Sequence, residues 1–426
     1  MSDAEFPRLL SIKPASLYSS DILEKAFQKA LLHTCPLSLR SLLECPRSNS
    51  KKLESLVDAH LFTALHVAAQ LNNVDLCKAW IKQELCLDSL DEERMTPLMH
   101  ASRKGYIEIL QCLLYAGCQV NSTDEGGYSA FFHSIHEIQP QAASLLLEHG
   151  AEVDCRDITQ ITPLMDAANY GNLDMCLYLI EKGAVIDLMD QSGTTALMVA
   201  AKHGNVDVCS FLLDQGADIE KRDQSGSTAF HLAVDNGEEE VMQLLLDMEI
   251  IDVNIPDGLG LSALHSCCIN GEEDLVLILL DYDANIDQQD NDGLTPLMYA
   301  CQFGHVNICK ILLKNKADIS LVDKDQCNAF MHAIINDQLG VCKFLLQKGA
   351  DINSRDDNGL TAIHRACRNR NEKLILLLLK SGCNVELNDD NGMNVWQYAE
   401  EADNSKTVEK EDFSVLDILK GHFATI

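Results

Sequence analysis

The sequence predicts an all-α repeat solenoid, because one short helical unit recurs through most of the chain. The units begin at eleven origins: Thr63, Thr96, Ser129, Thr162, Thr195, Thr228, Ser262, Thr295, Asn328, Thr361 and Asn394. Nine of the ten intervals between them are 33 residues, and the one from Thr228 to Ser262 is 34. Apolar residues with helical spacing follow each origin, and Asp and Gly recur at fixed offsets between the helical stretches. This period indicates stacked units that bury their apolar faces against one another.

The first helix of each unit is predicted to begin at the origin. A Thr or Ser there accepts free N–H groups of the first helical turn, and a following Pro, as in Thr96-Pro97, needs no partner for a missing N–H. Small residues at positions such as Ala200 and Ala201 keep this helix slim, so that neighbouring units can approach closely. A glycine nine residues after the origin, as at Gly204, suits the left-handed turn that ends the helix.

The second helix and a tight turn complete the unit. Val208, Phe211 and Leu212 show the i, i+3 and i+4 spacing of a buried helical face. An aspartate and a glycine three residues later, such as Asp190 and Gly193, suit a tight turn in which Asp bonds its own backbone. The recurring aspartates are therefore expected to be structural, with a ladder of metal sites as the alternative.

Four strings carry the resemblance to a known family. They are TPLMHAS at 96–102, TPLMDAA at 162–168, TPLMYAC at 295–301 and TAIHRAC at 361–367. Together with the period, they resemble the ankyrin repeat. The resemblance implies about eleven stacked 33-residue units, each a helix-turn-helix plus a β-hairpin-like turn. We expect the solenoid to span 58–403, with a helical N-terminal cap or extension at 1–57 and a charged loop and C-terminal capping helix at 404–426.

Composition limits the partners and the compartment. The formal net charge of −32 disfavours nucleic acid and anionic membranes as partners. No stretch approaches the ~18 apolar residues of a membrane span. The seventeen cysteines follow the repeat rather than a pairing scheme, which predicts buried free thiols in a reducing compartment. The sequence therefore predicts a soluble cytoplasmic protein, with the nucleus as the other compartment. Five cysteines lie fourteen residues after their origins: Cys77, Cys176, Cys209, Cys309 and Cys342.

Catalytic and metal-binding signatures do not stand out. We find no phosphate-binding loop, dinucleotide fingerprint, nucleophile elbow or Cys-x-x-Cys pair, and we expect no enzyme activity, cofactor or metal. His133, His136 and Glu137 form the only dense His/Glu group, but their spacing is not that of a His-Glu-x-x-His zinc site. Four histidines fall three residues after an origin, where other units carry Met, so they are expected to be structural. They are His66, His231, His265 and His364.

Partner contacts are expected at positions that the family resemblance places on a concave groove. In ankyrin repeats the hairpin tips and the outward face of the first helix form this groove for partner proteins. The corresponding apolar residues are Phe62, Tyr128, Ile161, Tyr170, Leu261, Leu294, Phe303 and Leu360. The alternative is that these residues shield the hairpin base or pack on the next unit. A second set of basic residues could attract an acidic peptide, or could be solvated helix ends: Arg103, Lys104, Lys202 and Arg368.

Two asparagines resemble the sites at which ankyrin repeats are modified by an asparaginyl hydroxylase. Asn254 and Asn353 each follow a Val or Ile, with an acidic residue two positions before and Leu eight positions before. The alternative, a turn-forming asparagine, is the more ordinary role.

These observations predict a monomeric, non-enzymatic scaffold or adaptor that binds intracellular proteins. The alternative function is a regulatory or targeting subunit of an enzyme complex, such as a phosphatase or a ubiquitin ligase. Neither end of the chain carries an effector motif that separates the two, and the repeat fold itself does not select one.

Overall fold

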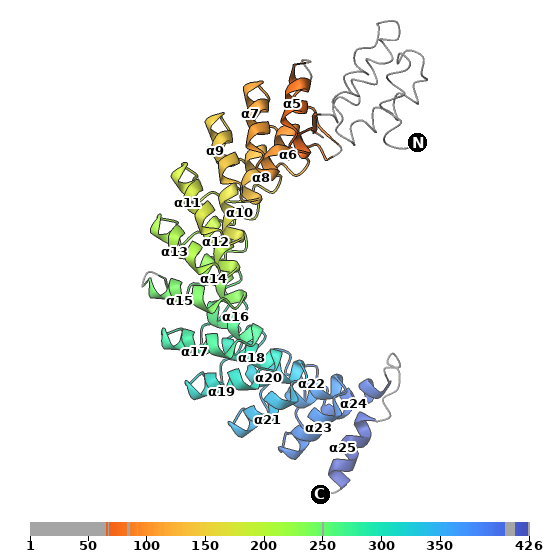
Figure 1. The fold of residues 1–426 in the computed structure, drawn as a ribbon. Helices are drawn as coiled ribbons and strands as arrows, with labels where there is room; N and C mark the ends of the chain where they lie inside the picture. The colour runs from red at the N-terminus through yellow and green to blue at the C-terminus, as the bar shows by residue number, and fades with distance from the viewer. Residues whose placement is uncertain are drawn as a thin grey trace, which may run out of the picture. The chain divides into compact units, whose positions relative to one another are not determined.

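Paired antiparallel helices and short hairpins make up the structure, a computed structural model (Figure 1). It describes residues 65–404, except for 67, 83–85, 92, 249 and 250, together with 414–424. Internal contacts divide the chain into two units, Met1–Gln191 and Ser192–Ile426. The predicted N-terminal cap at 1–57 lies outside the described residues, and so does Phe62.

In the first unit, the first helices of successive repeats pack side by side, and each second helix packs behind its own first helix. The first helices are α6 (Pro97–Lys104), α8 (Ala130–His136) and α10 (Pro163–Asn169). The second helices are α5 (Val74–Ile81), α7 (Ile107–Tyr115), α9 (Pro140–Glu148) and α11 (Leu173–Glu181).

The second unit repeats this arrangement through to the end of the described chain. Its first helices are α12 (Ala196–Lys202), α14 (Ala229–Asp235), α16 (Ala263–Asn270), α18 (Pro296–Phe303), α20 (Ala329–Ile335), α22 (Ala362–Arg368) and α24 (Val395–Asn404). Its second helices are α13 (Val206–Asp214), α15 (Glu239–Asp247), α17 (Glu273–Asp281), α19 (Val306–Lys314), α21 (Leu339–Gln347), α23 (Glu372–Lys380) and α25 (Val415–Ala424).

Helix ends follow the sequence signals. The Thr96 hydroxyl accepts the N–H of Met99 at 3.2 Å, and the Met99 sulfur accepts the N–H of Thr96 at 3.3 Å. In α16, His265 replaces the methionine, and its Nδ1 accepts the N–H of Ser262 at 3.0 Å. At the other end of α6, Gly105 adopts φ 66° in the left-handed region. The predicted helix starts and the predicted glycine turn are thus both present.

The third repeat keeps the same backbone although it lacks the turn glycine. Ile138 stands in the glycine position at φ 56°, a conformation that costs a branched residue energy. Pro140 is the first residue of α9, where its missing N–H leaves no helical bond unmade. Stacking against the neighbouring repeats therefore overrides the local preference of this turn.

Within each unit, the core is an apolar layer between the two helices of each repeat and between neighbouring repeats. Large apolar residues lie two positions after each of the first ten origins and are at most 2% exposed: Leu65, Leu98, Phe131, Leu164, Leu197, Phe230, Leu264, Leu297, Phe330 and Ile363. The five cysteines fourteen residues after an origin are fully buried, as predicted. Burial raises the pKa of the Cys176 and Cys209 thiols to about 12, so both behave as small apolar side chains.

Hairpins project from the helices and bond to one another at their tips. Within the second unit, the Lys324 N–H donates to the Asp292 carbonyl at 3.0 Å, and the Asp357 N–H donates to the Asp325 carbonyl at 2.8 Å. In the first unit, the Ile158 N–H donates to the Gly126 carbonyl at 3.0 Å. Successive tips are therefore joined by hydrogen bonds throughout the second unit and between the third and fourth repeats of the first.

The C-terminal helix α25 packs on α24 and on α23. Asp403 fixes its start, because its carboxylate accepts the Ser414 hydroxyl at 2.6 Å and the Val415 N–H at 3.0 Å. The part of the predicted charged loop at 405–413 lies outside the described residues. No helix in the described part of the chain has both the length and the apolar character that crossing a bilayer requires.

Candidate partner-binding groove

Each hairpin is built around its aspartate. In the third repeat, Asp124 Oδ1 accepts the N–H groups of Gly126 and Tyr128, both at 2.9 Å. Asp290 Oδ1 does the same for Asp292 and Leu294, at 2.9 and 2.8 Å. The aspartates therefore have the structural role that the sequence predicts. Among the described residues, no cluster of three or more His, Cys, Asp or Glu side chains is arranged to hold a metal ion.

The second oxygen of this aspartate ties the hairpin to the first helix, which the sequence did not reveal. The donor lies nine residues after the aspartate and four after the origin; we call this place the donor position. His133 Nε2 lies 2.8 Å from Asp124 Oδ2, and the Tyr299 hydroxyl donates to Asp290 Oδ2 at 2.7 Å. The same link occurs in six described repeats, through His100, His133, Tyr299, His332, Arg365 and Tyr398.

The fourth repeat inverts this pattern. Its donor position holds Asp166, a carboxylate that cannot donate to Asp157. Asp157 Oδ2 is instead 2.9 Å from the hydroxyl of its own turn residue, Thr159. The ion-pair partner of Asp166 is His136 of the preceding repeat, with Nδ1 3.2 Å from Oδ2. Burial raises the pKa of the Asp166 carboxyl, His136 lowers it, and the nearby Asp157 raises it. This site holds negative charge at the position where six other described repeats place a donor.

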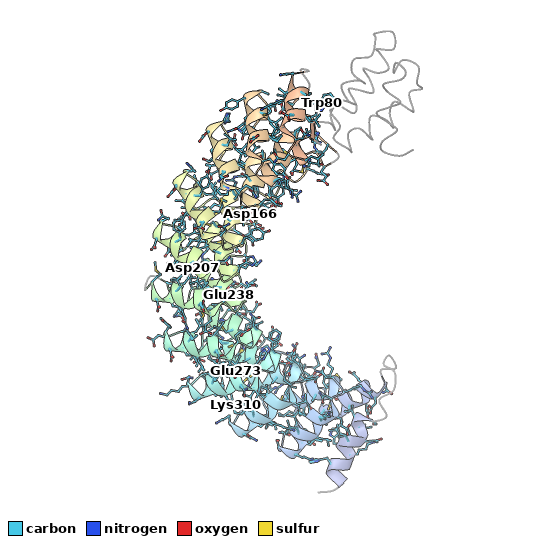
Figure 2. All side chains as sticks on the ribbon, viewed as in Figure 1. Trp80, Asp166, Asp207, Glu238, Glu273 and Lys310 are labelled. Atoms are coloured by element: carbon cyan, nitrogen blue, oxygen red, sulfur yellow. The ribbon has the colours of Figure 1, made fainter. Side chains whose placement is uncertain are left out.

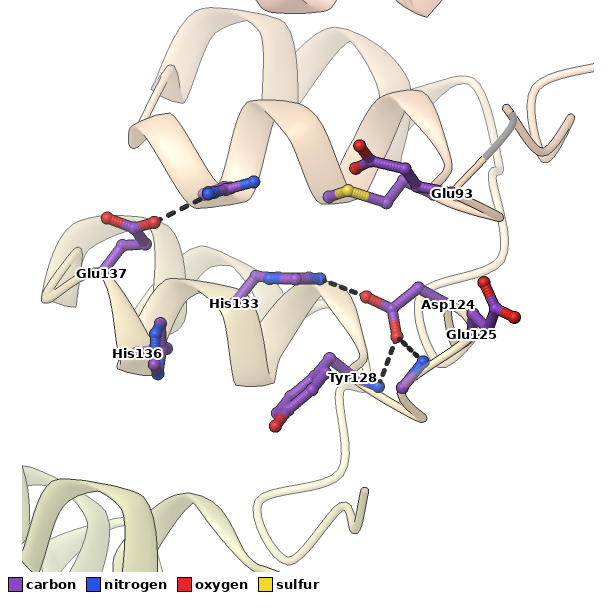
Figure 3. A pocket seen from close by; sticks show the side chains of 10 residues that line it. Glu93, Asp124, Glu125, Tyr128, His133, His136 and Glu137 are labelled. Carbon is purple, nitrogen blue, oxygen red and sulfur yellow. Dashed lines mark hydrogen bonds and ion pairs between the residues drawn. The ribbon is translucent and has the colours of Figure 1, made fainter. Parts of the chain in front are cut away.

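A pocket opens beside this site, between the second and third repeats (Figure 3). It encloses about 390 Å³. Arg103 and Glu137 close one end with an ion pair of 3.0 Å, whereas Glu93 and Glu125 lie at the hairpin end with exposed carboxylates. The lining consists of Glu93, Met95, Arg103, Asp124, Glu125, Gly126, Tyr128, His133, His136 and Glu137. Its carboxylates outnumber its one arginine, so it favours positively charged groups.

Two tyrosines flank the boundary between the pocket and Asp166. Tyr128 packs edge-on against Phe132, with 4.6 Å between ring centroids, and remains partly exposed. Burial and the negative charges of Asp157 and Asp166 raise the pKa of its phenol. Tyr170 is 61% exposed, and its ring meets His136 edge-on at 5.5 Å. Three aromatic rings thus lie close to the carboxylates of Asp157 and Asp166: those of Tyr128, His136 and Tyr170.

The structure places most of the predicted apolar contact residues at accessible positions. Tyr170 and Phe303 are exposed, at 61% and 46%. Partly exposed residues are Tyr128, Ile161, Leu261 and Leu294. Leu360 departs from the expectation: it is 5% exposed, as a residue that shields the base of its hairpin would be. The prediction of a contact residue is therefore not supported at Leu360.

The basic residues of the prediction do not form one patch. Arg103 is committed to its ion pair with Glu137, whereas Lys104 follows it at the exposed end of α6. In the second unit, Lys202 and Arg368 lie exposed at the ends of α12 and α22. Sequence inspection missed Asp166 and Ile158, which is 68% exposed at a hairpin tip. The signal for Asp166 was a carboxylate at a position that holds His, Tyr or Arg in six other repeats.

Asn254 and Asn353 occupy equivalent positions between successive repeats. Asn254 Oδ1 accepts the Asn285 N–H at 2.6 Å, and Asn353 Oδ1 accepts the Asn384 N–H at 2.8 Å. Asp287 makes the same bond to Asp318 at 2.9 Å. The position therefore has a structural role that Asn or Asp can fill, and hydroxylation of the two asparagines stays a prediction.

The histidines near the groove each have a specific hydrogen-bonding partner. Burial lowers the pKa of His133, so the ring is neutral at pH 7 and bonds Asp124. His265 joins two repeats, because its Nε2 lies 3.1 Å from the Leu294 carbonyl. His231 Nε2 lies 3.0 Å from the Ile255 carbonyl in the same way. The prediction that the origin histidines bond within and between repeats is met at His231 and His265.

Comparison with known proteins supplies the family. A family model described as "Ankyrin repeats (3 copies)" matches in overlapping segments: 38–124, 105–190, 130–223, 164–257, 217–290, 264–356 and 330–410. These segments cover most of the chain. The chain belongs to the ankyrin-repeat family. Its repeats therefore have the fold that their sequence motifs predict.

Three curated relatives of this ankyrin-repeat chain each match it over part of its length. The putative palmitoyltransferase ZDHHC13 of Danio rerio is 32% identical over 112 residues, which are 26% of this chain and 17% of that protein. The B-cell lymphoma 3 protein homolog of Mus musculus is 28% identical over 153 residues, 36% of this chain and 34% of that protein. Inversin of Mus musculus is 33% identical over 110 residues, 25% of this chain and 10% of that protein. The chain thus spans about a third or less of each relative's length.

Proposed function

We propose that this ankyrin-repeat chain is a non-enzymatic scaffold that binds partner proteins through its first-helix face and hairpin tips. The observation that carries the proposal is the exposure of Tyr170, an aromatic side chain beside a pocket and at the end of a first helix. Large aromatic side chains that combine exposure with a neighbouring cavity are typical anchors of protein interfaces. Membership of the ankyrin-repeat family supports the same role.

The second unit offers an equivalent anchor. Phe303 ends α18 eight residues after its origin, the place that Tyr170 holds in the fourth repeat. Its ring stacks on His305 with 6.4 Å between centroids, and 46% of the residue is exposed. The two units thus present an aromatic side chain at the same place in the repeat, which supports one binding face used in each unit.

Two pairs of polar side chains in the pocket bond to each other. His133 is bonded to Asp124, and Glu137 is paired with Arg103. A general base needs an acceptor atom directed at substrate, and these side chains direct theirs at one another. This supports a binding role for the pocket.

Affinity capture with matched variants tests the proposal. The full chain is compared with Tyr170→Ala and Phe303→Ala, and with the controls Tyr115→Ala and Tyr282→Ala on the second-helix face, where the tyrosines are 78% and 39% exposed. We expect a discrete partner that the first pair loses and the controls retain, with all four variants equally folded by circular dichroism. Equal capture by all variants would contradict the proposal.

A further inference from the structure

In the fourth repeat, the donor position holds a carboxylate, whereas six other described repeats hold His, Tyr or Arg there. In the tenth repeat, the Arg365 guanidinium fills the donor position and lies 3.1 Å, from Nε, from Asp356 Oδ2. In the fourth repeat, Asp166 stands there instead, and Asp157 lies close enough to raise its pKa. A guanidinium is thus compatible with this position of the repeat, and the fourth repeat has none of its own.

Asp166 is partly buried, and the side chain paired with it is more exposed than the carboxylate itself. The Asp166 side chain is 14% exposed, and its ion-pair partner His136 is 42% exposed. Asp166 sits on α10, in the row of first helices (Figure 2). Tyr128 and His136 line the pocket of about 390 Å³, and His136 is also the side chain that pairs with Asp166, so the pocket lies next to this carboxylate.

Aromatic and apolar groups border the carboxylates. Tyr170 is 61% exposed beside His136, and Ile158, one residue after Asp157, is 68% exposed. Tyr128 supplies a partly exposed ring on the pocket side. Aromatic faces attract a guanidinium, and exposed apolar side chains attract the apolar residues of a peptide.

The charge of the surface selects the sign of the occupant. Glu93 and Glu125 line the pocket, and Asp166 adds a carboxylate next to it through its contact with His136. The arginine in the lining, Arg103, is paired with Glu137. A cation would gain from these charges, and an acidic peptide would be repelled.

We propose that this groove binds an extended segment of a partner protein that carries an arginine, whose guanidinium binds Asp166 between Tyr128 and Tyr170. The segment's neighbouring apolar side chains pack against Ile158 and into the pocket. This inference rests on the proposed binding function and specifies its partner. The basic groups predicted from the sequence would have favoured an acidic peptide, and the surface around Asp166 favours the opposite charge.

The test is a set of dodecapeptide libraries with one fixed central residue, either arginine, citrulline or glutamate, titrated against the full chain. Citrulline has the shape of arginine without its charge. We expect arginine peptides to bind at least about tenfold more tightly than citrulline peptides, because a charge-assisted hydrogen bond to a carboxylate is lost. Their affinity should also fall as salt rises.

Variants assign the binding to Asp166. Asp166→Asn should weaken arginine peptides about tenfold, and Asp166→Arg should abolish their binding, because the chain then supplies its own guanidinium. Asp174→Asn and Asp174→Arg are the controls, since Asp174 is exposed in the first turn of α11 and matches the change in charge. They should bind like the unmodified chain.

Three results would overturn the inference. They are equal binding of citrulline or glutamate peptides, unchanged binding by Asp166→Arg, and no arginine peptide bound. If capture of a partner is still lost in Tyr170→Ala in any of these cases, the proposed function stands. Only the proposal that Asp166 binds an arginine of the partner then fails. If Asp166→Arg instead abolishes self-association of the chain in light scattering, the occupant is a second copy of this chain.

Discussion

Arg365 and Asp356 lie nine residues apart and join the first helix of the tenth repeat to its hairpin. The Arg365 side chain is 23% exposed, and the Asp356 side chain is completely buried. The same connection is made by His133 to Asp124 and by Tyr398 to Asp389. The hairpin edge is thus held to the helices by one partly buried link between side chains in each of these repeats.

Arg365→Ala should destabilise the second unit by about 1–3 kcal/mol, because it leaves a buried carboxylate oxygen without its donor. Arg365→Tyr should destabilise the second unit less, because Tyr299 occupies the same donor position in its own repeat and donates to Asp290. Hydrogen exchange of the α22 amides measures the local opening energy. Equal exchange in Arg365→Ala and the unmodified chain would contradict the role of this bond.

Asp166→Asn should stabilise the first unit at pH 7. Burial, opposed by His136 and assisted by Asp157, raises the pKa of Asp166 in the folded state. Because the pKa of Asp166 is higher in the folded than in the unfolded chain, its ionisation lowers the free energy of unfolding at pH values above both pKa values. This loss of stability disappears below the unfolded pKa of about 3.9, where the carboxyl is protonated in both states. The gain in melting temperature should therefore shrink as the pH is lowered towards 4. A melting temperature that falls at pH 7 would refute this description of Asp166.

Replacing His231 and His265 with Met should flatten the acid sensitivity of the second unit. Burial lowers the pKa of both rings in the folded state. Below an unfolded pKa of about 6.5, the unfolded chain binds protons that the folded rings resist, so stability is lost as the pH falls. Methionine does not titrate, so it removes this acid-dependent loss of stability. It also removes the hydrogen bond from each ring to the next repeat, which costs about 1 kcal/mol for each histidine. Melting curves between pH 5 and 8 measure both effects. A variant as acid-sensitive as the parent would show that other groups titrate.

Asn254 and Asn353 are predicted to gain one oxygen each when the chain is incubated with an asparaginyl hydroxylase. Both side chains are bonded to the next repeat, so the reaction requires local opening of the hairpin. Asn121 is an internal control: its Oδ1 accepts the Glu152 N–H at 3.1 Å, but Gln119 stands where the other two sites have an acidic residue. Peptide mass spectrometry separates the three sites. Unmodified Asn254 and Asn353 would assign them a turn role alone.

The sequence predicted the fold because its signals are local and repeated. Thr96, Pro97 and Gly105 specify the start and end of a helix through backbone chemistry within one turn. Because the signals recur from repeat to repeat, the turn can be predicted even where one repeat lacks its usual residue, as where Ile138 replaces the turn glycine. The helix positions and the structural role of the aspartates could therefore be predicted.

The groove was less predictable because it depends on which side chains meet across repeats. The link from Asp124 to His133 spans hairpin and helix, and periodicity alone does not reveal it. Leu360 shares its sequence position with Tyr128, yet it is buried while Tyr128 remains partly exposed. Exposure at this position depends on side-chain size and on the neighbouring hairpin, which the sequence pattern does not encode.

Hydrogen exchange of the full chain with and without a captured partner tests the binding face most directly. We predict that the partner slows exchange in α8, α10 and the hairpins at 124–128 and 157–161, around Tyr128 and Tyr170. The second helices α7, α9 and α11 should exchange at unchanged rates. Protection confined to those second helices, with α8 and α10 unaffected, would contradict the proposed groove.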